Sequence, residues 1–523
     1  MSQTPFYITT PIYYVNGEPH IGTAYTTVAA DTIARFNRLD GQDVHFLTGL
    51  DEHGQKVAQS ATEHGMTPQQ WCDSQLPQFQ ELWRDLDITN DDFIRTTEER
   101  HIAGVQKFLQ ALYDNGYLYK DSYEGLYCTP CETFFNEDDL VDGCCPDCGR
   151  PVQPIKEENW FFKLSEFGDK LIAYYEANPE FIRPEIRRNE VMSFVKGGMH
   201  DLSISRSTFD WGVPLPFDPE HVTYVWVDAL INYLTALGYG SDDESQLEYR
   251  WPADFHFVGK DIIRFHCVIW PAMLMAAGLP VTEHVLAHGF LLVKNPETGK
   301  GEKMSKSRGN SIFPQQVIDF LGVEGYRYYF MTDVSHGMDG AISFERMAQV
   351  YNADLANSWG NLVSRSLNMS AKYFEGASPA RGEGWEQRTS PLLEAAQGIY
   401  GRYAQKMAAF DYQGAAKDVM EFVAVANHYI EDKAPWALAK DPANAEELAF
   451  VIWGLIEAIR IAATLLEPFT PATSAEVMRR IGLPCEPCCD LEAACAWGQF
   501  EGGRPVEKGD ALFPRLDMAN LPC

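Results

Sequence analysis

Two short strings, near residues 20 and 303, carry side chains that could handle phosphate. His20, Gly22 and Thr23 follow a β-rich segment at 6–10 and precede apolar residues at helical spacing, so they lie where a strand gives way to a helix. Unpaired backbone N–H groups and the helix dipole favour an anion at that point. Lys303 and Lys306 stand in a segment rich in Ser, Gly and Asn, and two ammonium groups on such a loop could close over a triphosphate. The predicted chemistry is stabilisation of phosphate charge.

Either string alone is compatible with a purely structural role, a turn for the first and a solvated basic loop for the second. The ordered pair resembles the two signature strings of the class I aminoacyl-tRNA synthetases, which activate an amino acid with ATP and load it onto tRNA. The family string usually ends in a second histidine, and here Thr23 takes that place. The resemblance implies that the catalytic residues are His20, Thr23, Lys303 and Lys306. It implies that ATP, accompanied by Mg²⁺, is contacted by His20, Gly22, Thr23, Gly259, Asp261, His288, Gly289 and Lys306.

The strings between these two narrow the resemblance to the methionyl-tRNA synthetases, over nearly the full length of the chain. They are Ile-Tyr-Tyr at 12–14, Thr-Gly-Leu-Asp-Glu-His-Gly at 48–54, Val-Trp-Val-Asp-Ala at 225–229 and Gly-Lys-Asp at 259–261. The resemblance implies a methionine pocket formed by Ile12, Tyr14, Asp51, Trp226, Ala229, Leu230, Tyr233, Phe265, His266 and Trp270. Asp51 would hold the substrate ammonium, and Tyr233 could donate its hydroxyl hydrogen to the thioether sulfur. The alternative is that these aromatic residues are ordinary core.

Four cysteines form a zinc pattern of two Cys-x2-Cys pairs: Cys128, Cys131, Cys145 and Cys148. Four thiolates complete a tetrahedral shell without an open position, so we expect one structural Zn²⁺ per chain. Unliganded thiols or disulfides are the alternatives. A second group near the C-terminus lacks a matching pair, and we expect unliganded thiols there: Cys485, Cys488, Cys489 and Cys495.

The order of predicted elements indicates an α/β protein with a Rossmann-type parallel sheet, split by a zinc-binding connective domain and followed by an all-α helical-bundle anticodon-binding domain. Predicted strands at 6–10 and 44–48 are each followed by a helix. The alternation resumes at 222–227, with further strands at 255–258 and 285–287. The expected domains are the first catalytic half at 1–115, the connective domain at 116–215, the second catalytic half at 216–295, a lysine-loop and stem-contact region at 296–345, and the helical domain at 346–523.

In the helical part, two strings resemble those that meet the CAU anticodon in this family. The resemblance implies that Trp436 stacks on a base, that Asn361 and Arg365 read base edges, and that Pro435 belongs to the same surface. A tryptophan buried inside a helix bundle is the alternative.

The overall charge argues against nucleic acid, because phosphate contacts normally come from a positive surface and the chain carries −32. Basic residues nevertheless cluster at 183–188 and 303–308, so we expect a local positive track on an acidic exterior. The N-terminus lacks the pattern of a secretory signal, and the most apolar segment, at 449–468, contains Glu457 and Arg460. We expect a cytoplasmic protein that does not enter membranes and, without an appended dimerising module, a monomer.

These observations favour a methionine–tRNA ligase that charges initiator and elongator tRNA-Met. A class I synthetase for another apolar amino acid is the first alternative, although the valine, isoleucine and leucine enzymes need a longer insertion for hydrolytic editing. A small-molecule nucleotidyltransferase would lack the anticodon strings, and a non-catalytic RNA-binding or scaffold protein would not need the lysine string at 303–307.

Overall fold

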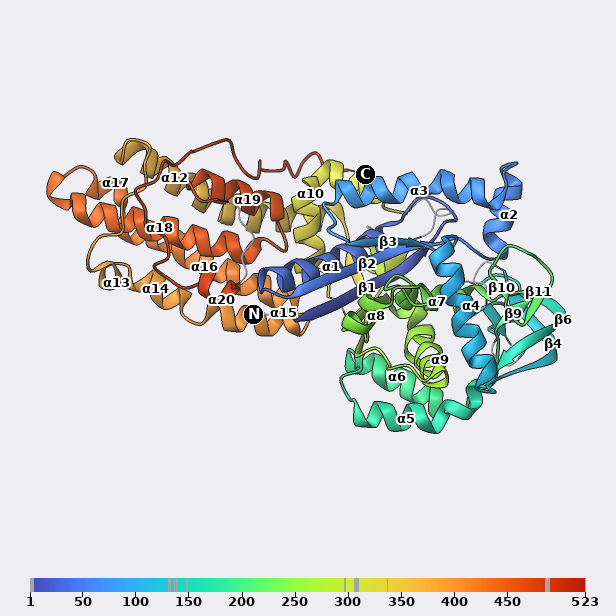
Figure 1. Ribbon diagram of the computed structural model, residues 1–523. Helices are drawn as coiled ribbons and strands as arrows, with labels where there is room; N and C mark the ends of the chain where they lie inside the picture. The colour runs from blue at the N-terminus through green and yellow to red at the C-terminus, as the bar shows by residue number, and fades with distance from the viewer. Residues whose placement is uncertain are drawn as a thin grey trace. The chain divides into compact units, whose positions relative to one another are not determined.

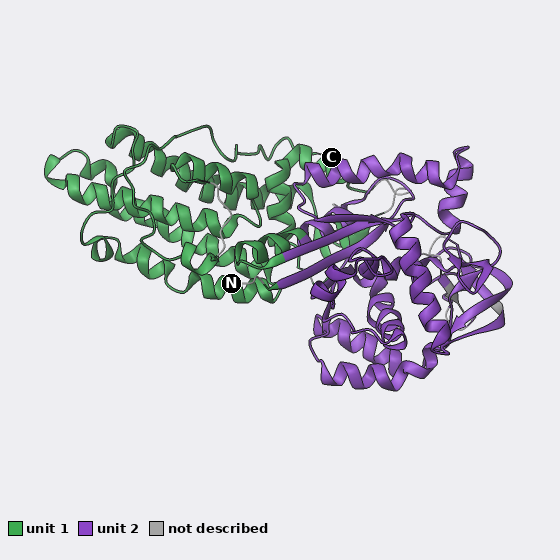
Figure 2. Ribbon diagram, viewed as in Figure 1, with its two compact units in different colours: residues 1–4, 31–43, 291–523 green, residues 5–30, 44–290 purple. Residues whose placement is uncertain are grey.

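The computed structural model describes residues 4–129, 133–135, 137, 140–146, 149–295, 298–304, 310–335, 337–484 and 490–522. Side chains at 123, 124, 134 and 135 are outside this description. The chain forms two compact units (Figure 2). One comprises residues 5–30 and 44–290, and the other comprises residues 1–4, 31–43 and 291–523.

The first unit, which we call the sheet unit, is built on six strands in the order β3-β2-β1-β12-β13-β7. Figure 1 labels the first three of them, β3, β2 and β1. Their bounds are Pro5–Tyr14 for β1, Asp43–Asp51 for β2, Asp92–Arg95 for β3, Ile182–Arg183 for β7, Phe255–Gly259 for β12 and His284–His288 for β13. The pairs β1–β12, β12–β13, β13–β7 and β2–β3 are parallel. Neighbours β1 and β12 stand far apart in sequence, so a long insertion splits the sheet, which confirms the predicted fold class.

The insertion contains two antiparallel sheets. One has the order β5-β4-β6-β8, with bounds Thr133–Phe135, Leu118–Cys128, Gln153–Phe162 and Leu202–Ser203. The other has the order β10-β11-β9, with bounds Pro214–Leu215, Asp218–Thr223 and Ser205–Arg206. The connection from β6 to β8 contains α5, α6 and β7, and β7 joins the parallel sheet beside β13.

One predicted strand is wrong. The segment 222–227 divides between β11, which ends at Thr223, and helix α7 (Val225–Thr235). Every residue of α7 except Trp226 is buried, so its sequence is apolar on nearly all sides. Periodicity cannot distinguish a short apolar run of this kind from a buried strand.

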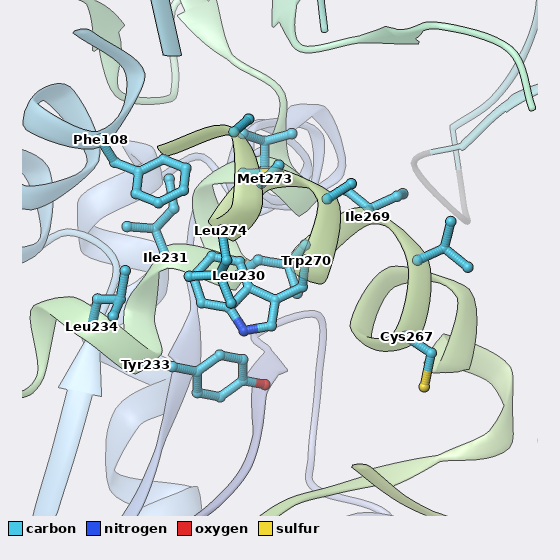
Figure 3. Packing of buried hydrophobic residues seen from close by; sticks show 14 of the residues in the cluster. Phe108, Leu230, Ile231, Tyr233, Leu234, Cys267, Ile269, Trp270, Met273 and Leu274 are labelled. Atoms are coloured by element: carbon cyan, nitrogen blue, oxygen red, sulfur yellow. The ribbon is translucent and has the colours of Figure 1, made fainter. Parts of the chain in front are cut away.

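Helices of the sheet unit pack on both sheet types and on each other: α1 (Ile21–Leu39, through residue 30), α2 (Gln55–Glu63), α3 (Pro68–Asp85), α4 (Glu99–Asp114), α5 (Gly168–Ala177), α6 (Glu185–Lys196), α7, α8 (Ser245–Arg250) and α9 (Trp270–Ala277). A single large core gathers around Trp270, whose indole lies beside Phe108, Tyr233 and residues of α7 and α9 (Figure 3). Most residues of α7 pack into this core, so the core fixes the position of the helix.

The second unit, which we call the helical unit, includes the second half of α1 and a small sheet of β14 (Leu291–Lys294), β15 (Gly301–Lys303) and β16 (Gly340–Ile342). Its helices are α10 (Pro314–Thr332), α11 (Phe344–Val350), a π-helix at Tyr351–Gly360, α12 (Asn361–Tyr373), α13 (Trp385–Arg388), α14 (Ser390–Ala396), α15 (Ile399–Ala408), α16 (Tyr412–Lys433), α17 (Pro435–Leu438), α18 (Ala445–Leu466), α19 (Pro471–Arg480) and α20 (Leu491–Ala494).

Helix α18 is the centre of this bundle and runs beside α16 (Figure 1). Among the described residues, the segment Pro442–Leu466 is the one helix long and apolar enough to cross a membrane, and 94% of its most apolar window is buried inside the protein. Glu457 and Arg460 form a buried ion pair within it, 2.7 Å apart. It is a core helix of the bundle, as its sequence predicts.

Candidate active site and anticodon-binding surface

The first phosphate string forms the start of α1. The His20 imidazole folds over the helix end, and its Nδ1 accepts the backbone N–H of Gly22 at 3.1 Å and of Thr23 at 3.2 Å. A Cβ at residue 22 would lie 3.1 Å from the ring, so glycine leaves the imidazole room to take this position. Because Nδ1 is an acceptor, the proton of the neutral ring sits on Nε2. His20 is exposed and can therefore offer an N–H to an anion at the helix N-terminus.

Thr23, which replaces the second histidine of the family string, is buried. Its Oγ1 lies 3.3 Å from His20 Nε2, and its side chain is only 4% exposed. In this arrangement the hydroxyl supports the His20 ring rather than facing outward on its own.

The strings predicted to contact the nucleotide meet at the carboxyl ends of β12 and β13. Gly259 pairs with His288 across these strands. His288 Nε2 lies 2.8 Å from Thr26 Oγ1, which joins the end of β13 to the helix of the first string across 262 positions. A Cβ at residue 259 would lie 2.4 Å from Asp261 Oδ1, so glycine leaves the Asp261 carboxylate room to take this position. Carboxyl ends of parallel strands are the usual ligand edge of such sheets.

The predicted methionine pocket combines residues from four places in the sheet unit. Asp51 ends β2 and is buried. Trp226 on α7 stacks on Phe265, with ring centroids 4.0 Å apart, and both rings are half-buried. The other members from the second half are buried, and those from β1 pack against the same core: Ala229, Leu230, Tyr233, His266 and Trp270, and Ile12 and Tyr14. Phe265 and His266 begin a π-helix at Phe265–Ile269, a distortion that is frequent at functional sites.

The direction of one hydrogen bond among these residues bears on the expected role of Tyr233. His266 Nδ1 lies 3.1 Å from the carbonyl of Ile262, which can only accept, so Nδ1 carries the ring proton. Burial lowers the pKa of His266 to about 4, so the ring is neutral and Nε2 is an acceptor. The Tyr233 hydroxyl, 2.7 Å from Nε2, therefore donates its hydrogen to His266 and presents only lone pairs to its other neighbours. We therefore expect that Tyr233, with its hydrogen engaged by His266, does not donate to a thioether sulfur.

A second buried polar cluster lies behind this pocket. Asp228 on α7 accepts from His53 and His101, at 2.6 and 2.8 Å. Sequence reasoning assigned no role to these residues. The available signal was a carboxylate inside an otherwise apolar helix, since a buried charge requires hydrogen-bonding partners.

Two of the four predicted zinc ligands are described, Cys128 at the end of β4 and Cys145. Both are buried, and they share a small apolar cluster with Leu126, Leu140 and Val152. Gly149 N–H donates to the Cys145 carbonyl at 2.8 Å. These two thiols fit a structural metal site. Cys131 and Cys148 lie outside the described residues, within which no group of three metal-binding side chains occurs.

Two further predictions fall partly outside the description. Lys303 ends β15, opposite Leu292 of β14, and is exposed, whereas Lys306 lies outside the described residues. Cys485, Cys488 and Cys489 also lie outside them, and Cys495 is buried after α20.

The predicted anticodon residues come together in the helical unit. Trp436 on α17 is 42% exposed, so the alternative of a buried tryptophan is wrong. The Arg365 guanidinium on α12 lies 5.9 Å from the centroid of this ring and pairs with Glu431 at 2.7 Å. Asn361 is the first residue of α12, one turn before Arg365, and follows directly on the π-helix.

The backbone before Trp436 has an unusual conformation. Ala434 ends α16 with φ 42° and ψ 61°, in the left-handed region, and Pro435 then begins α17. This sharp change of direction turns the indole outward from the end of a long helix.

The fold is that of a class I aminoacyl-tRNA synthetase. Its parallel sheet is split by an insertion, its first helix begins with the phosphate string, and its helical unit exposes Trp436. Family models agree: residues 6–154 and 151–367 match "tRNA synthetases class I (M)", and residues 379–521 match "Anticodon binding domain of methionyl tRNA ligase".

Known proteins similar to this chain are methionine–tRNA ligases. The chain is 47% identical in sequence to the methionine–tRNA ligase of Caldanaerobacter subterraneus, and the match covers 98% of this chain and 79% of the relative. It is 46% identical to the methionine–tRNA ligase of Streptomyces coelicolor, and the match covers 98% of this chain and 97% of the relative. The solved methionyl-tRNA synthetase of Mycobacterium tuberculosis in complex with methionyl-adenylate is 42% identical and superposes with a TM-score of 0.92, over 98% of this chain and 100% of that one. The chain belongs to the methionyl-tRNA synthetase family, and its function is that of a methionine–tRNA ligase.

Proposed function

We propose that the sheet unit activates L-methionine with ATP at the carboxyl edge of its parallel sheet, and that the product adenylate then esterifies the 3′ end of tRNA-Met. The proposal rests on the bond between Thr26 and His288, because it brings the phosphate string at the start of α1 beside the nucleotide strings of β12 and β13. ATP, accompanied by Mg²⁺, would lie along this edge on His20, Gly22, Thr23, Gly259, Asp261, His288 and Gly289.

In the first step, the methionine carboxylate attacks the α-phosphorus of ATP and pyrophosphate leaves. This carboxylate is ionised at neutral pH, so no general base is needed. Catalysis then consists of positioning the reactants and stabilising phosphate charge. His20 would supply its Nε2–H, while Thr23 would hold the ring and so act indirectly. Lys303 and Lys306 would stabilise the departing pyrophosphate.

Recognition of methionine would divide between charge and shape. The buried Asp51 carboxylate would bind the substrate ammonium, which every α-amino acid carries. Discrimination would therefore come from the walls formed by Trp226, Phe265 and Trp270, since a thioether gains about 0.3–1.5 kcal/mol from each contact with a ring.

Recognition of tRNA would use the helical unit. Trp436 would stack on an anticodon base, with Asn361 and Arg365 hydrogen-bonding to base edges and Pro435 fixing the start of α17. The exposed indole beside a guanidinium supports this assignment. Both initiator and elongator tRNA-Met would be substrates, because both carry the same anticodon.

Several structural assignments complete the proposal. One Zn²⁺ would be held by Cys128, Cys131, Cys145 and Cys148, where four thiolates would fix the fold of the β4–β6 region. The protein would act as a cytoplasmic monomer. We also propose that the domain boundaries lie at residues 115, 215, 295 and 345.

The decisive experiment is ATP–pyrophosphate exchange with each of the twenty amino acids. We expect exchange with methionine alone at near-physiological concentrations. Faster exchange with leucine, isoleucine or valine than with methionine would contradict the assigned pocket.

A further inference from the structure

Asp228 is a buried carboxylate for which the proposed reaction has no direct use. Its side chain on α7 is 0% exposed, and its neighbours along the helix, from Val225 to Leu230, are apolar. Burying an ionised carboxylate costs several kcal/mol unless donors compensate it. Burial raises the pKa of Asp228, but His53 and His101 outweigh that effect and bring the pKa to about 2. Asp228 is therefore ionised and depends on two imidazole N–H donors.

The two histidines serve different parts of the sheet unit. His101 belongs to α4 and bonds to α7 twice, through Nε2 to Asp228 at 2.8 Å and through Nδ1 to Thr235 Oγ1 at 2.8 Å. It ties one helix to another in the core. His53 instead lies two residues after Asp51 and bonds through Nδ1 to the other Asp228 oxygen at 2.6 Å. It ties a loop to α7.

The loop that contains His53 is held from several sides. The Tyr14 hydroxyl donates to the His53 carbonyl at 3.0 Å, and the Trp211 indole N–H donates to the Glu52 carbonyl at 2.6 Å. The Trp211 ring also meets the His53 ring edge-on, with centroids 5.3 Å apart. These contacts fix the loop to β1 and to the insertion. The bond from His53 to Asp228 fixes it to α7.

The neighbours of Asp228 on α7 give this bond its significance. Trp226 and Ala229 are proposed walls of the methionine side-chain site, and Asp51 is the proposed ammonium ligand. A substrate that spans both must find them at one spacing, and misplacement by about 1 Å can cost roughly 100-fold in rate.

We propose that Asp228, acting through His53, is a positioning residue for methionine recognition. It sets the spacing between Asp51 and the α7 residues Trp226 and Ala229. This inference rests on the proposed function of Asp51 and Trp226. His101 shares the same carboxylate but holds only α4, so its contribution is to stability and not to substrate affinity.

The test compares the two histidines. His53→Leu removes the donor on the loop, and His101→Leu removes the donor on α4. We expect His53→Leu to raise the KM for methionine by roughly 10- to 100-fold in pyrophosphate exchange, with the KM for ATP changed less than about twofold. His101→Leu should lower the melting temperature while the KM for methionine stays within about twofold.

A conservative variant separates positioning from general damage. In His53→Asn the amide nitrogen can occupy the place of Nδ1, so it should restore most of the lost methionine affinity. Equal rises of the KM for methionine in both leucine variants, or no rise in His53→Leu, would overturn the inference. If His53→Leu is insoluble, Asp228→Asn takes its place in the same comparison with His101→Leu.

Asp51→Asn distinguishes this inference from the proposed function on which it rests. An unchanged KM for methionine in that variant would contradict the assignment of the ammonium site itself. A raised KM in Asp51→Asn, together with an unaffected His53→Leu, would overturn only the role of Asp228.

Discussion

The Tyr233 hydroxyl donates a hydrogen bond to Nε2 of His266 across 2.7 Å, among the buried residues that we propose to form the methionine pocket. The direction of this bond follows from the Ile262 carbonyl, which holds the ring proton on Nδ1. Tyr233 would therefore contribute ring surface and an oxygen lone pair to the proposed pocket.

Tyr233→Phe should change the preference for methionine over norleucine, which replaces the sulfur by a methylene, by less than about threefold in kcat/KM. The reason is that no sulfur hydrogen bond is lost. The variant should be less stable by about 1–3 kcal/mol, because His266 Nε2 loses its donor in a buried position. Pyrophosphate exchange with both amino acids and thermal melting measure the two effects, and a large loss of preference would show that the hydroxyl does contact sulfur.

Acidification should destabilise the sheet unit through His266. Its pKa is about 4 in the folded protein and higher when unfolded, so the unfolded chain binds more protons between those values. The stabilisation is complete above the ordinary histidine pKa of about 6.5 and declines as the pH falls from there toward 4. We expect the melting temperature to drop between pH 7 and pH 5, and His266→Gln to drop less over the same range. Parallel pH profiles would contradict this prediction.

Trp436→Ala should separate the two steps of the reaction. Loss of one base–indole stack costs about 1–3 kcal/mol, so aminoacylation of tRNA-Met should fall by roughly 10- to 100-fold in kcat/KM. Methionine-dependent pyrophosphate exchange should remain within about twofold, because it needs no tRNA. Val425→Ala, at another exposed position of the helical unit, is the matched control. Equal losses in exchange and charging would be inconsistent with an anticodon role.

Lys306→Ala should slow adenylate formation by at least about tenfold and leave methionine binding nearly unchanged, because its charge acts on the phosphates as pyrophosphate departs. Lys300→Ala removes an ammonium from the same region and should have little effect. Single-turnover formation of the adenylate and equilibrium binding of methionine provide the measurements, and an unaltered rate would argue against the assigned role.

Removal of zinc should loosen the β4–β6 sheet. Purified protein should contain about one Zn²⁺ per chain, and Cys128→Ser should reduce that content, because structural zinc sites couple binding to folding. Cys144→Ser, next to Cys145 but outside the pattern, should retain the metal. Elemental analysis and hydrogen exchange of residues 118–162 test this, and protein fully protected there without metal would rule the site out.

The sequence predicts four strands of the parallel sheet, β1, β2, β12 and β13, because each contains a short apolar run, and it does not predict β3 and β7. It fails at 222–227, where α7 is buried on nearly every side and loses the pattern that distinguishes helix from strand. The phosphate string, the fold class and the family are recognisable from short strings, each made of residues that are close together in sequence.

Other features depend on contacts that sequence spacing does not contain. His53 and Asp228 are 175 positions apart, and Asp228 and His101 are 127 apart, so only the fold reveals that one carboxylate serves both. The role of Tyr233 depends on which nitrogen of His266 carries a proton, which is decided by a backbone carbonyl one turn away.

Ala434 adopts a backbone geometry that L-amino acids avoid, at a cost of about 1–2 kcal/mol. Glycine at this position would relieve the strain but would give the backbone between α16 and α17 more conformational freedom. If Trp436 stacks on an anticodon base as proposed, alanine followed by proline would orient the indole beforehand, and less conformational entropy would be lost on binding. In that case a small backbone strain in the free protein would accompany an indole that is already oriented for stacking.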